Sequence, residues 1–299
     1  METIVSFRND GFASFCDLLR RYLNDQGNPD IAGCCIAIAG PVTATTARLT
    51  NRDWEFERAD IAAILGGAQV VLINDLAALG SALPVLSEDR LLNLKPAGSQ
   101  RRLNGQSIVV GAGTGFNVCL TRRISASRVV VIEAEAGHSA LTTRVASPLV
   151  AALGADAAAQ FVTLEDCFSG RGLSALYRVL SDGKNLQAHE IISAYTDQSD
   201  PVAQRAVALS ADLLGRCLLD LIHIYLPFEG VYLAGGVARG ILGSAACDLF
   251  LEAVNAPVPL AEDFRHIPIS VIQDDAAALL GCVANLSEMS RDRLGLRTA

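Results

Sequence analysis

The sequence predicts an α/β fold in which the strands of a mainly parallel sheet alternate with covering helices. Apolar runs of strand length alternate with longer stretches whose apolar residues recur at helical spacing, and few long linkers separate them. Apolar residues make up 51% of the 299 residues and charged residues 19%, which is ample material for a buried core. Aromatic residues contribute only 5%, whereas aliphatic residues and 25 glycines are abundant, so covered parallel strands are favoured over an aromatic-rich sandwich or barrel. A chain of this length forms one large domain or two of ordinary size.

The first half of the sequence predicts one helix and two strands. A helix is expected to begin near Asn9 or Asp10, both good capping residues, because apolar side chains then recur at helical spacing. Residues 35–39 form an apolar run that Gly40-Pro41 stops, which predicts a buried strand. A second apolar run at 69–73 leads directly into Asn74-Asp75.

The second half predicts more strands and at least three helices. Ser147-Pro148 and Asp200-Pro201 each place a capping residue before a proline, which predicts a helix start at both points. Asp274 and Asp275 are placed to cap a last Ala-rich helix. Polar residues from 99 to 106 predict a connector and a domain boundary. Strands are expected at 107–110, from 116 onward, and at 128–132, 230–234 and 267–272.

Charge and cysteine content exclude several classes of protein. With 24 Lys and Arg against 32 Asp and Glu, the net charge is −8, which argues against a nucleic-acid or anionic-membrane partner. The eight cysteines form no C-x-x-C pair and most lie in apolar runs, so reduced, buried thiols are expected. No basic-then-apolar leader opens the sequence, and no apolar stretch reaches the roughly 20 residues that span a bilayer. A cytoplasmic protein is therefore expected.

Asp75 follows an apolar strand, at the position where α/β folds bind ligands. One interpretation makes this carboxylate a cap for the helix that starts at Leu76. The other makes it a catalytic base, with Asn74 beside it donating to a substrate hydroxyl.

Gly111-Ala112-Gly113-Thr114-Gly115 is a glycine loop between two expected strands. Its backbone N–H groups can approach an anion closely, and Thr114 adds a hydroxyl. The dinucleotide fingerprint fails because Phe116 occupies its last glycine position, and no Gly-Lys-Ser/Thr follows as in a P-loop. The loop is therefore either a phosphate-binding hairpin or a plain tight turn.

Glu135-Ala136-Gly137-His138, with Glu165 further along, offers carboxylates and an imidazole for holding sugar hydroxyls. The competing interpretation of His138 is a structural histidine. A metal site is disfavoured because the histidines are scattered and no Cys/His cluster has zinc spacing; His223 lies in an apolar helical run and is expected to be structural. Late in the chain, Gly235-Gly236 ends an apolar strand and either leaves room for a purine or forms a common strand–helix turn.

The order of these motifs resembles the bacterial glucokinase family, within the actin-like ATPase superfamily of sugar kinases. The resemblance extends over almost the whole chain. It includes Asn74-Asp75 after a strand, the Gly-Ala-Gly-Thr-Gly hairpin, Glu-x-Gly-His, Glu165 before Phe168-Ser169-Gly170, and Ala-Gly-Gly after a strand, with further matches at Thr50-Asn51, Trp54, Gly172-Leu173, Leu176-Tyr177-Arg178 and Gly230-Val231-Tyr232.

The resemblance implies a two-domain actin-like ATPase (ribonuclease-H-like) fold with an inter-domain cleft. Residues 1–105 with 283–299 are expected to form the smaller domain and 106–282 the larger. The implied activity transfers the ATP γ-phosphoryl group to the 6-hydroxyl of glucose with Mg²⁺, and a homodimer is the expected oligomer. The resemblance implies Asp75 as the base that accepts the 6-hydroxyl proton. It implies that the other sugar hydroxyls are held by Asn74, Glu135, His138 and Glu165. It places Gly111, Gly113, Thr114 and Gly115 at the phosphates and Gly235 and Gly236 by the adenosine.

The sequence departs from the family pattern at its start. The family opens with a strand and an Asp-x-Gly-Gly-Thr phosphate loop whose Asp helps place the metal, whereas Glu2-Thr3-Ile4-Val5-Ser6 resembles a stretch further into the family. Three explanations stay open: a start recorded too late, a fragment or paralogue that binds sugar but transfers phosphate poorly, or a substitute carboxylate. Loss of the first strands would predict low stability or association. Smaller departures are Ala136, where the family usually has Gly, and Asn117.

Overall fold

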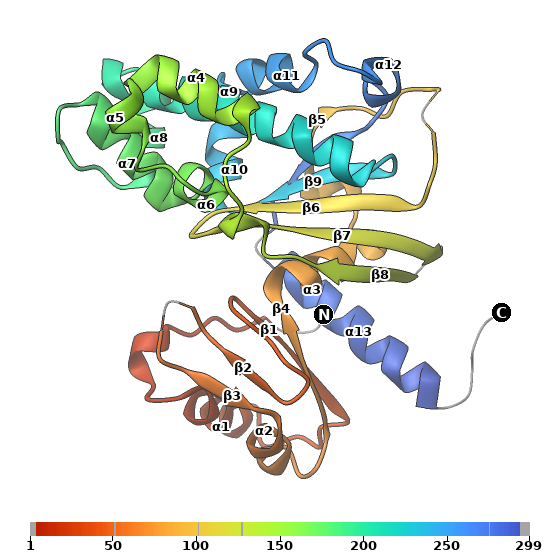
Figure 1. Cartoon of the computed structure of the whole chain (residues 1–299). Helices are drawn as coiled ribbons and strands as arrows, with labels where there is room; N and C mark the ends of the chain where they lie inside the picture. Colours follow the sequence, from red (N-terminus) through yellow and green to blue (C-terminus); the bar gives the residue numbers. More distant parts are fainter. Residues whose placement is uncertain (1–3, 51, 101, 127, 275, 294–299) are drawn as a thin grey trace. The chain divides into compact units, whose positions relative to one another are not determined.

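The computed structural model describes residues 4–50, 52–100, 102–126, 128–274 and 276–293. Glu2, Thr3, Asn51 and Asp275, on which parts of the sequence predictions rest, lie outside the described residues. The chain divides into a smaller unit, Met1–Leu83 with Ala278–Ala299, and a larger unit, Pro84–Ala277. Figure 1 shows the elements of both.

The smaller unit is built on a parallel pair of strands with helices packed on it. Strand β1 pairs with β4 in parallel, from Gly33 opposite Gln69 to Ile38 opposite Asn74. The core of this unit gathers Leu19, Trp54, Phe56 and Ile61. Its elements are η1 (Asn9–Gly11), α1 (Phe15–Asp25), β1 (Gly33–Ile38), β2 (Thr46–Arg48), β3 (Glu55–Glu57), α2 (Arg58–Ile64), β4 (Gln69–Asn74), α3 (Asp75–Ala82) and most of α13 (Ala277–Arg293).

Most of helix α13 packs on the smaller unit. Gly281 lies so close to α3 that an added Cβ would overlap the carbonyl oxygen of Ala78. Leu286 reaches β1, where a Cβ on Gly33 would lie 3.3 Å from its Cδ2. Glycine at both positions therefore permits close packing of this helix.

The larger unit contains a mixed six-stranded sheet in the order β5-β10-β9-β6-β7-β8. Strands β6, β9 and β10 run parallel, whereas β6, β7 and β8 form antiparallel neighbours. These strands are β5 (Leu91–Lys95), β6 (Gln106–Ala112), β7 (Phe116–Ser125), β8 (Arg128–Glu133), β9 (Gly230–Ala234) and β10 (Ile269–Ile272).

Helices of the larger unit gather over one face of this sheet (Figure 1). The long α9 buries residues at helical spacing, among them Val207, Leu214, Leu218 and Ile222, in a core that also includes Ile108 and other strand residues. The remaining elements are η2 (Leu83–Val85), η3 (Glu88–Arg90), η4 (Ala136–His138), α4 (Thr143–Leu153), α5 (Ala155–Ala158), α6 (Leu164–Phe168), α7 (Gly170–Leu180), α8 (Ala188–Thr196), α9 (Pro201–Tyr225), α10 (Gly236–Leu242), α11 (Cys247–Val254) and α12 (Ala261–Phe264).

Two predicted helix starts were wrong. Helix α1 begins at Phe15 rather than near Asn9, because Ser14 accepts the N–H of Asp17 at 3.1 Å and residues 9–11 form a separate 3₁₀ turn. Helix α4 begins at Thr143, and Pro148 lies inside it. Proline there removes one helical hydrogen bond and crowds the carbonyl four residues earlier, and the burial of Val145 and Leu149 offsets this cost.

Residues 84–105 belong to the larger unit in the structure, whereas the sequence placed them in the smaller domain. The reason is β5, which pairs antiparallel with β10 and so extends the large sheet. At the other end of the chain, residues 278–282 belong to the smaller unit, so the division falls within α13.

The described residues include no helix with the length and apolar character required to cross a membrane. All eight cysteines are free. The expected burial holds for Cys119, Cys167, Cys217 and Cys282, whereas Cys16, Cys34, Cys35 and Cys247 are partly exposed.

Lys95, at the end of β5, is a partly buried cation. Its Nζ donates to the carbonyl of Phe264 at 3.2 Å and to Asn255 Oδ1 at 3.4 Å. Burial lowers the pKa of this ammonium from 10.5 to about 8. The folded state therefore holds fewer protons than the unfolded state between pH 8 and 10.5, and the charge of Lys95 costs stability below that window.

Lys95→Met is expected to raise the free energy of unfolding at pH 7 by about 2 kcal/mol, because it removes a poorly solvated charge. The gain over wild type should shrink as pH rises through the window, where wild-type Lys95 loses its proton. Urea denaturation of both proteins at several pH values measures this difference. If the difference in free energy of unfolding between Lys95→Met and wild type does not change across this pH range, the pKa of Lys95 is not lowered by folding.

Candidate active site

Asn74 and Asp75 have different roles at the start of α3 in the smaller unit. The Asn74 side chain caps the helix by accepting the N–H of Leu76 at 2.9 Å and that of Ala77 at 3.3 Å. Asp75 is the first residue of the helix, and its Oδ1 accepts the same Leu76 N–H at 2.8 Å. Burial raises the pKa of the Asp75 carboxyl. The capping role therefore belongs to Asn74, and Asp75 retains a partly buried carboxylate.

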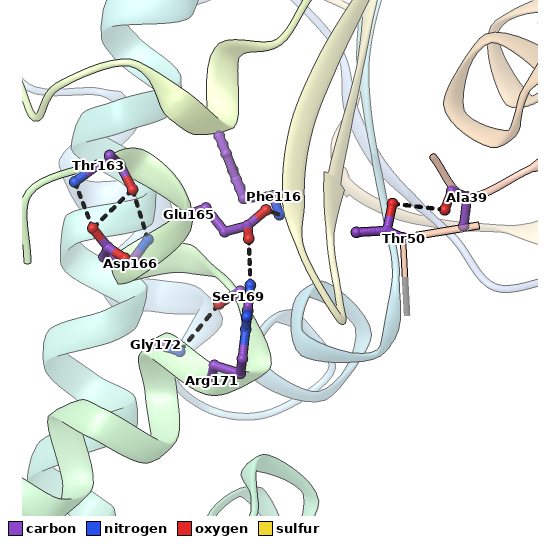
Figure 2. Close-up of polar contacts among 9 residues, drawn as sticks. All are labelled: Ala39, Thr50, Phe116, Thr163, Glu165, Asp166, Ser169, Arg171 and Gly172. Atoms are coloured by element: carbon purple, nitrogen blue, oxygen red, sulfur yellow. Dashed lines mark hydrogen bonds and ion pairs between the residues drawn. The ribbon is translucent and has the colours of Figure 1, made fainter. Parts of the chain in front are cut away.

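The turn after β1 lies beside this pair. Asn74 Nδ2 donates to the carbonyl of Gly40 at 3.3 Å. Thr50, which follows β2, also bonds this turn: its Oγ1 donates to the carbonyl of Ala39 at 2.9 Å (Figure 2). An added Cβ on Gly40 would overlap the carbonyl of Arg48. These contacts fix the backbone around Asn74.

The glycine loop in the larger unit is a tight hairpin between β6 and β7. Ala112 pairs with Phe116, and the Gly113 N–H donates to the carbonyl of Gly115 at 2.9 Å. The carbonyl of Gly113 accepts the N–H of Gly170 at 2.7 Å, which ties the hairpin to the start of α7. Thr114 is exposed at the tip. The expected strand–loop–strand geometry is confirmed.

Glu165 lies against this hairpin. Its Oε2 accepts the N–H of Phe116 at 3.2 Å, and its Oε1 forms an ion pair with Arg171 Nη2 at 2.5 Å (Figure 2). A Cβ on Gly115 would lie 2.7 Å from Oε2, and a Cβ on Gly137 would overlap the carbonyl of Phe116. Both glycines therefore permit the close approach of the hairpin to Glu165 and to the Glu135–His138 segment.

Glu135 is positioned by Asn117, one of the two small departures from the family pattern. Asn117 Nδ2 donates to Glu135 Oε2 at 3.2 Å, and Asn117 Oδ1 accepts the N–H of Ala136 at 2.9 Å. Glu135 and His138 are both exposed. An amide at position 117 can donate to a carboxylate and accept from a backbone N–H at once, which is how it orients this segment.

Gly235 and Gly236 lie next to the hairpin. A Cβ on Gly113 would be 3.5 Å from both the Gly235 Cα and the Gly236 nitrogen. Gly235 has φ +99°, and a Cβ there would overlap the carbonyl of Ala112. The two glycine segments therefore meet because β6 and β9 are parallel neighbours, with Gly111 opposite Ala234.

A cavity of about 820 Å³ opens beside these glycines. This volume is within the range of pockets that hold a nucleotide-sized ligand. Helices α7 and α8 line the far wall and supply two cations and an imidazole. The lining includes Gly113, Thr114, Gly236, Arg171, Arg178 and His189.

The larger unit thus brings together most of the predicted site residues: Gly111, Gly113, Thr114, Gly115, Gly235 and Gly236 adjoin one another, with Glu165 on the hairpin and the Glu135–His138 segment beside it. The sequence predictions missed Asn117, Arg171, Arg178 and His189. Arg171 and Arg178 are seven residues apart, a spacing that places both on one face of a helix. That spacing and the departure from the family pattern at Asn117 were the available signals.

His223 has a structural role, as expected: its Nδ1 lies 2.7 Å from the carbonyl of Leu219, and its ring packs edge-on against Phe264. Among the residues that the structure describes, no group of three or more His, Cys, Asp or Glu side chains is arranged to hold a metal ion.

Comparison with known proteins shows the family of this chain. A family model described as Glucokinase matches residues 1–289. The chain belongs to the glucokinase family. The glucokinase of Saccharophagus degradans is 26% identical over 294 residues, covering 97% of this chain and 91% of the relative. That of Klebsiella pneumoniae is 32% identical over 266 residues, covering 85% and 80%.

Solved structures of glucokinases share the fold. The glucokinase of an Antarctic psychrotroph superposes with a TM-score of 0.76 at 26% identity, covering 94% of this chain and 88% of that one. A ROK family glucokinase from Streptomyces griseus, solved with glucose and AMPPNP, gives 0.62 at 21% identity, covering 91% and 86%, and shows the fold alone. The expected family and the expected two-domain α/β fold of the actin-like ATPases are confirmed.

Proposed function

We propose that this protein transfers the γ-phosphoryl group of ATP to the 6-hydroxyl of D-glucose, giving glucose 6-phosphate and ADP. The observation that supports this most is the cavity beside the glycine hairpin, which is lined by two arginines, one of which, Arg171, forms an ion pair with Glu165. Membership of the glucokinase family gives the sugar and the reaction.

The nucleotide is proposed to occupy the cavity of the larger unit. The glycine hairpin with Gly111, Gly113, Thr114 and Gly115 is proposed to lie against its phosphates, and Gly113 and Thr114 line the cavity. Gly235 and Gly236 are proposed to lie by the adenosine, and Gly236 lines the cavity. Arg171 and Arg178 add positive charge to the wall. A polyanion is the ligand that such a wall favours.

The sugar hydroxyls are proposed to bind Asn74, Glu135, His138 and Glu165. Carboxylates accept from hydroxyls, the amide donates, and the imidazole does either, so this set suits a ligand whose groups both donate and accept. Phosphoryl transfer depends mostly on positioning and charge neutralisation.

Asp75 is proposed to act as the general base. Its carboxylate accepts the proton of the 6-hydroxyl while the bond from O6 to the γ-phosphorus forms. The bond from that phosphorus to the β,γ-bridging oxygen breaks, and ADP leaves with the electron pair. Partial burial, which raises the pKa of Asp75, makes it a better proton acceptor than an exposed aspartate.

Mg²⁺ is proposed to enter as the complex with ATP. The residues that line the cavity include no carboxylate, so they supply no ligand set for the ion there. A homodimer stays a prediction, which sedimentation analysis measures.

The test of the proposal is formation of glucose 6-phosphate from glucose and MgATP, followed by a coupled assay, with mannose and glucosamine as competing substrates. Glucose should be phosphorylated with the highest kcat/KM. Thermal stabilisation by glucose without any product would instead identify a sugar-binding protein that has lost phosphoryl transfer.

Asn117→Ala is expected to raise the KM for glucose by about tenfold, because Glu135 loses the amide that orients it, a loss of about 1.4 kcal/mol. The KM for ATP should change by less than about twofold. Gln106→Ala, on the strand that pairs with the far end of β7, is the control for general damage to this hairpin. An unchanged KM for glucose in Asn117→Ala would remove Asn117 from this role.

A further inference from the structure

Arg171 lies between the two halves of the proposed site. It is the second residue of α7, and it lines the nucleotide cavity together with Gly113 and Thr114. From the same position its guanidinium reaches Glu165, a residue proposed to bind the sugar, with Nη2 2.5 Å from Oε1 (Figure 2). One side chain therefore touches both sites.

The two oxygens of Glu165 differ in their partners. Oε2 accepts the backbone N–H of Phe116, which is part of the hairpin and does not move away without unpairing β7. Oε1 is the oxygen that Arg171 engages. A sugar hydroxyl that binds Glu165 can therefore replace Arg171 at Oε1, whereas Phe116 keeps its bond to Oε2.

The contact between Arg171 and Glu165 is well placed to exchange partners. The Arg171 side chain is 78% exposed, against 25% for Glu165. Ion pairs with so exposed a member contribute little, typically about 0–1 kcal/mol, because water solvates the charge almost as well. The bond to Glu165 uses only one of the five N–H donors on the guanidinium, so the others are available to a phosphate. The planar arrangement of these donors matches the oxygens of a phosphate.

We propose that Arg171 couples the two substrates: the phosphates of a bound nucleoside triphosphate draw its guanidinium away from Glu165 Oε1, which then accepts a sugar hydroxyl. Arg171 is a positioning residue for Glu165 in this scheme, and the inference rests on the proposed function. By linkage, the sugar raises the affinity for the nucleotide by the same factor. The coupling is the same whether the sugar or the nucleotide binds first.

The experiment measures the Kd of glucose by calorimetry with and without saturating AMPPNP. AMPPNP should lower the Kd of wild type by about fivefold or more, a typical size for such coupling. In Arg171→Met, the Kd without nucleotide should fall by about threefold because Oε1 is no longer occupied, and AMPPNP should change it by less than about twofold. A merely structural role for Arg171 does not predict tighter sugar binding.

Two further variants sharpen the test. Arg178→Met removes a cation from the same cavity and the same helix. Arg178 Nη2 donates to Gln160 Oε1 at 3.5 Å and not to Glu165, so AMPPNP should bind more weakly while the coupling factor persists. Arg171→Lys keeps the charge without the fork and should retain part of the coupling. Thermal melts of each variant check that it folds.

The outcomes separate the two proposals. If wild type binds glucose and AMPPNP but Arg171→Met keeps the wild-type coupling factor, the role of Arg171 is overturned and the proposed function stands. Equal loss of coupling in Arg178→Met would likewise overturn it, because general positive charge would then be the cause. If wild type binds neither ligand, the proposed function itself fails, and the coupling with it.

Discussion

Asp75→Asn is expected to lower the turnover of glucose by about two to four decades, the usual range for loss of a general base. The amide is nearly isosteric and can still accept the N–H of Leu76, so the start of α3 is preserved. The Kd of glucose should stay within a few-fold of wild type. Steady-state kinetics and calorimetry on the same preparation measure both quantities.

The pH profile provides a second readout for Asp75. Because burial raises the pKa of this carboxyl, the acid limb of kcat/KM should fall at a higher pH than an ordinary aspartate would give. That limb should be absent from the residual activity of Asp75→Asn. Asp60→Asn is the matched control: it makes the same change of charge at an exposed carboxylate in the smaller unit and should leave turnover unchanged. Near-normal turnover in Asp75→Asn would exclude Asp75 as the base.

Gly235→Ala is expected to destabilise the larger unit by about 2–4 kcal/mol and to weaken AMPPNP binding by at least about tenfold. Two costs add at this position. The φ of +99° is unfavourable for any residue with a Cβ, and the new methyl would overlap the carbonyl of Ala112. Relief of that overlap requires β9 to move away from the glycine hairpin, which disturbs the proposed phosphate and adenosine contacts together.

Gly236→Ala is the matched control for stability. It adds the same methyl one residue later, where the structure has open space and no left-handed backbone. Its free energy of unfolding, measured by urea denaturation, should equal or slightly exceed that of wild type because alanine favours the helix. If Gly235→Ala is as stable as Gly236→Ala, the backbone at position 235 is not constrained as described.

Local signals in the sequence were sufficient wherever a few neighbouring residues decide the structure. Strand β9 spans the predicted Gly230–Ala234, and α9 begins at the predicted Pro201 with Asp200 as its cap, which accepts the N–H of Val202 at 2.7 Å. The glycine hairpin likewise formed as predicted, because glycines between two apolar strands leave few alternatives.

Predictions were less successful where competing local signals were of similar strength. Asn9, Asp10 and Ser14 are all good caps, and the choice of Ser14 follows from which apolar residues of α1 reach the core, where Leu19 and Leu23 are buried. Residues 84–105 carried no signal for the unit to which they belong, because the pairing of β5 with β10 joins segments far apart in the sequence.

The sequence by itself determined the α/β class, the family through the order of its motifs, and the residue types available for phosphate and sugar. The tertiary structure decided which of those residues meet: Gly235 against the hairpin, Asn117 on Glu135, and Arg171 on Glu165. The physical reason is the distance along the chain over which each kind of interaction acts. Caps, turns and hydrophobic periodicity act over a few residues, whereas a binding site is made by strand order and close packing, which bring together side chains that no local pattern connects.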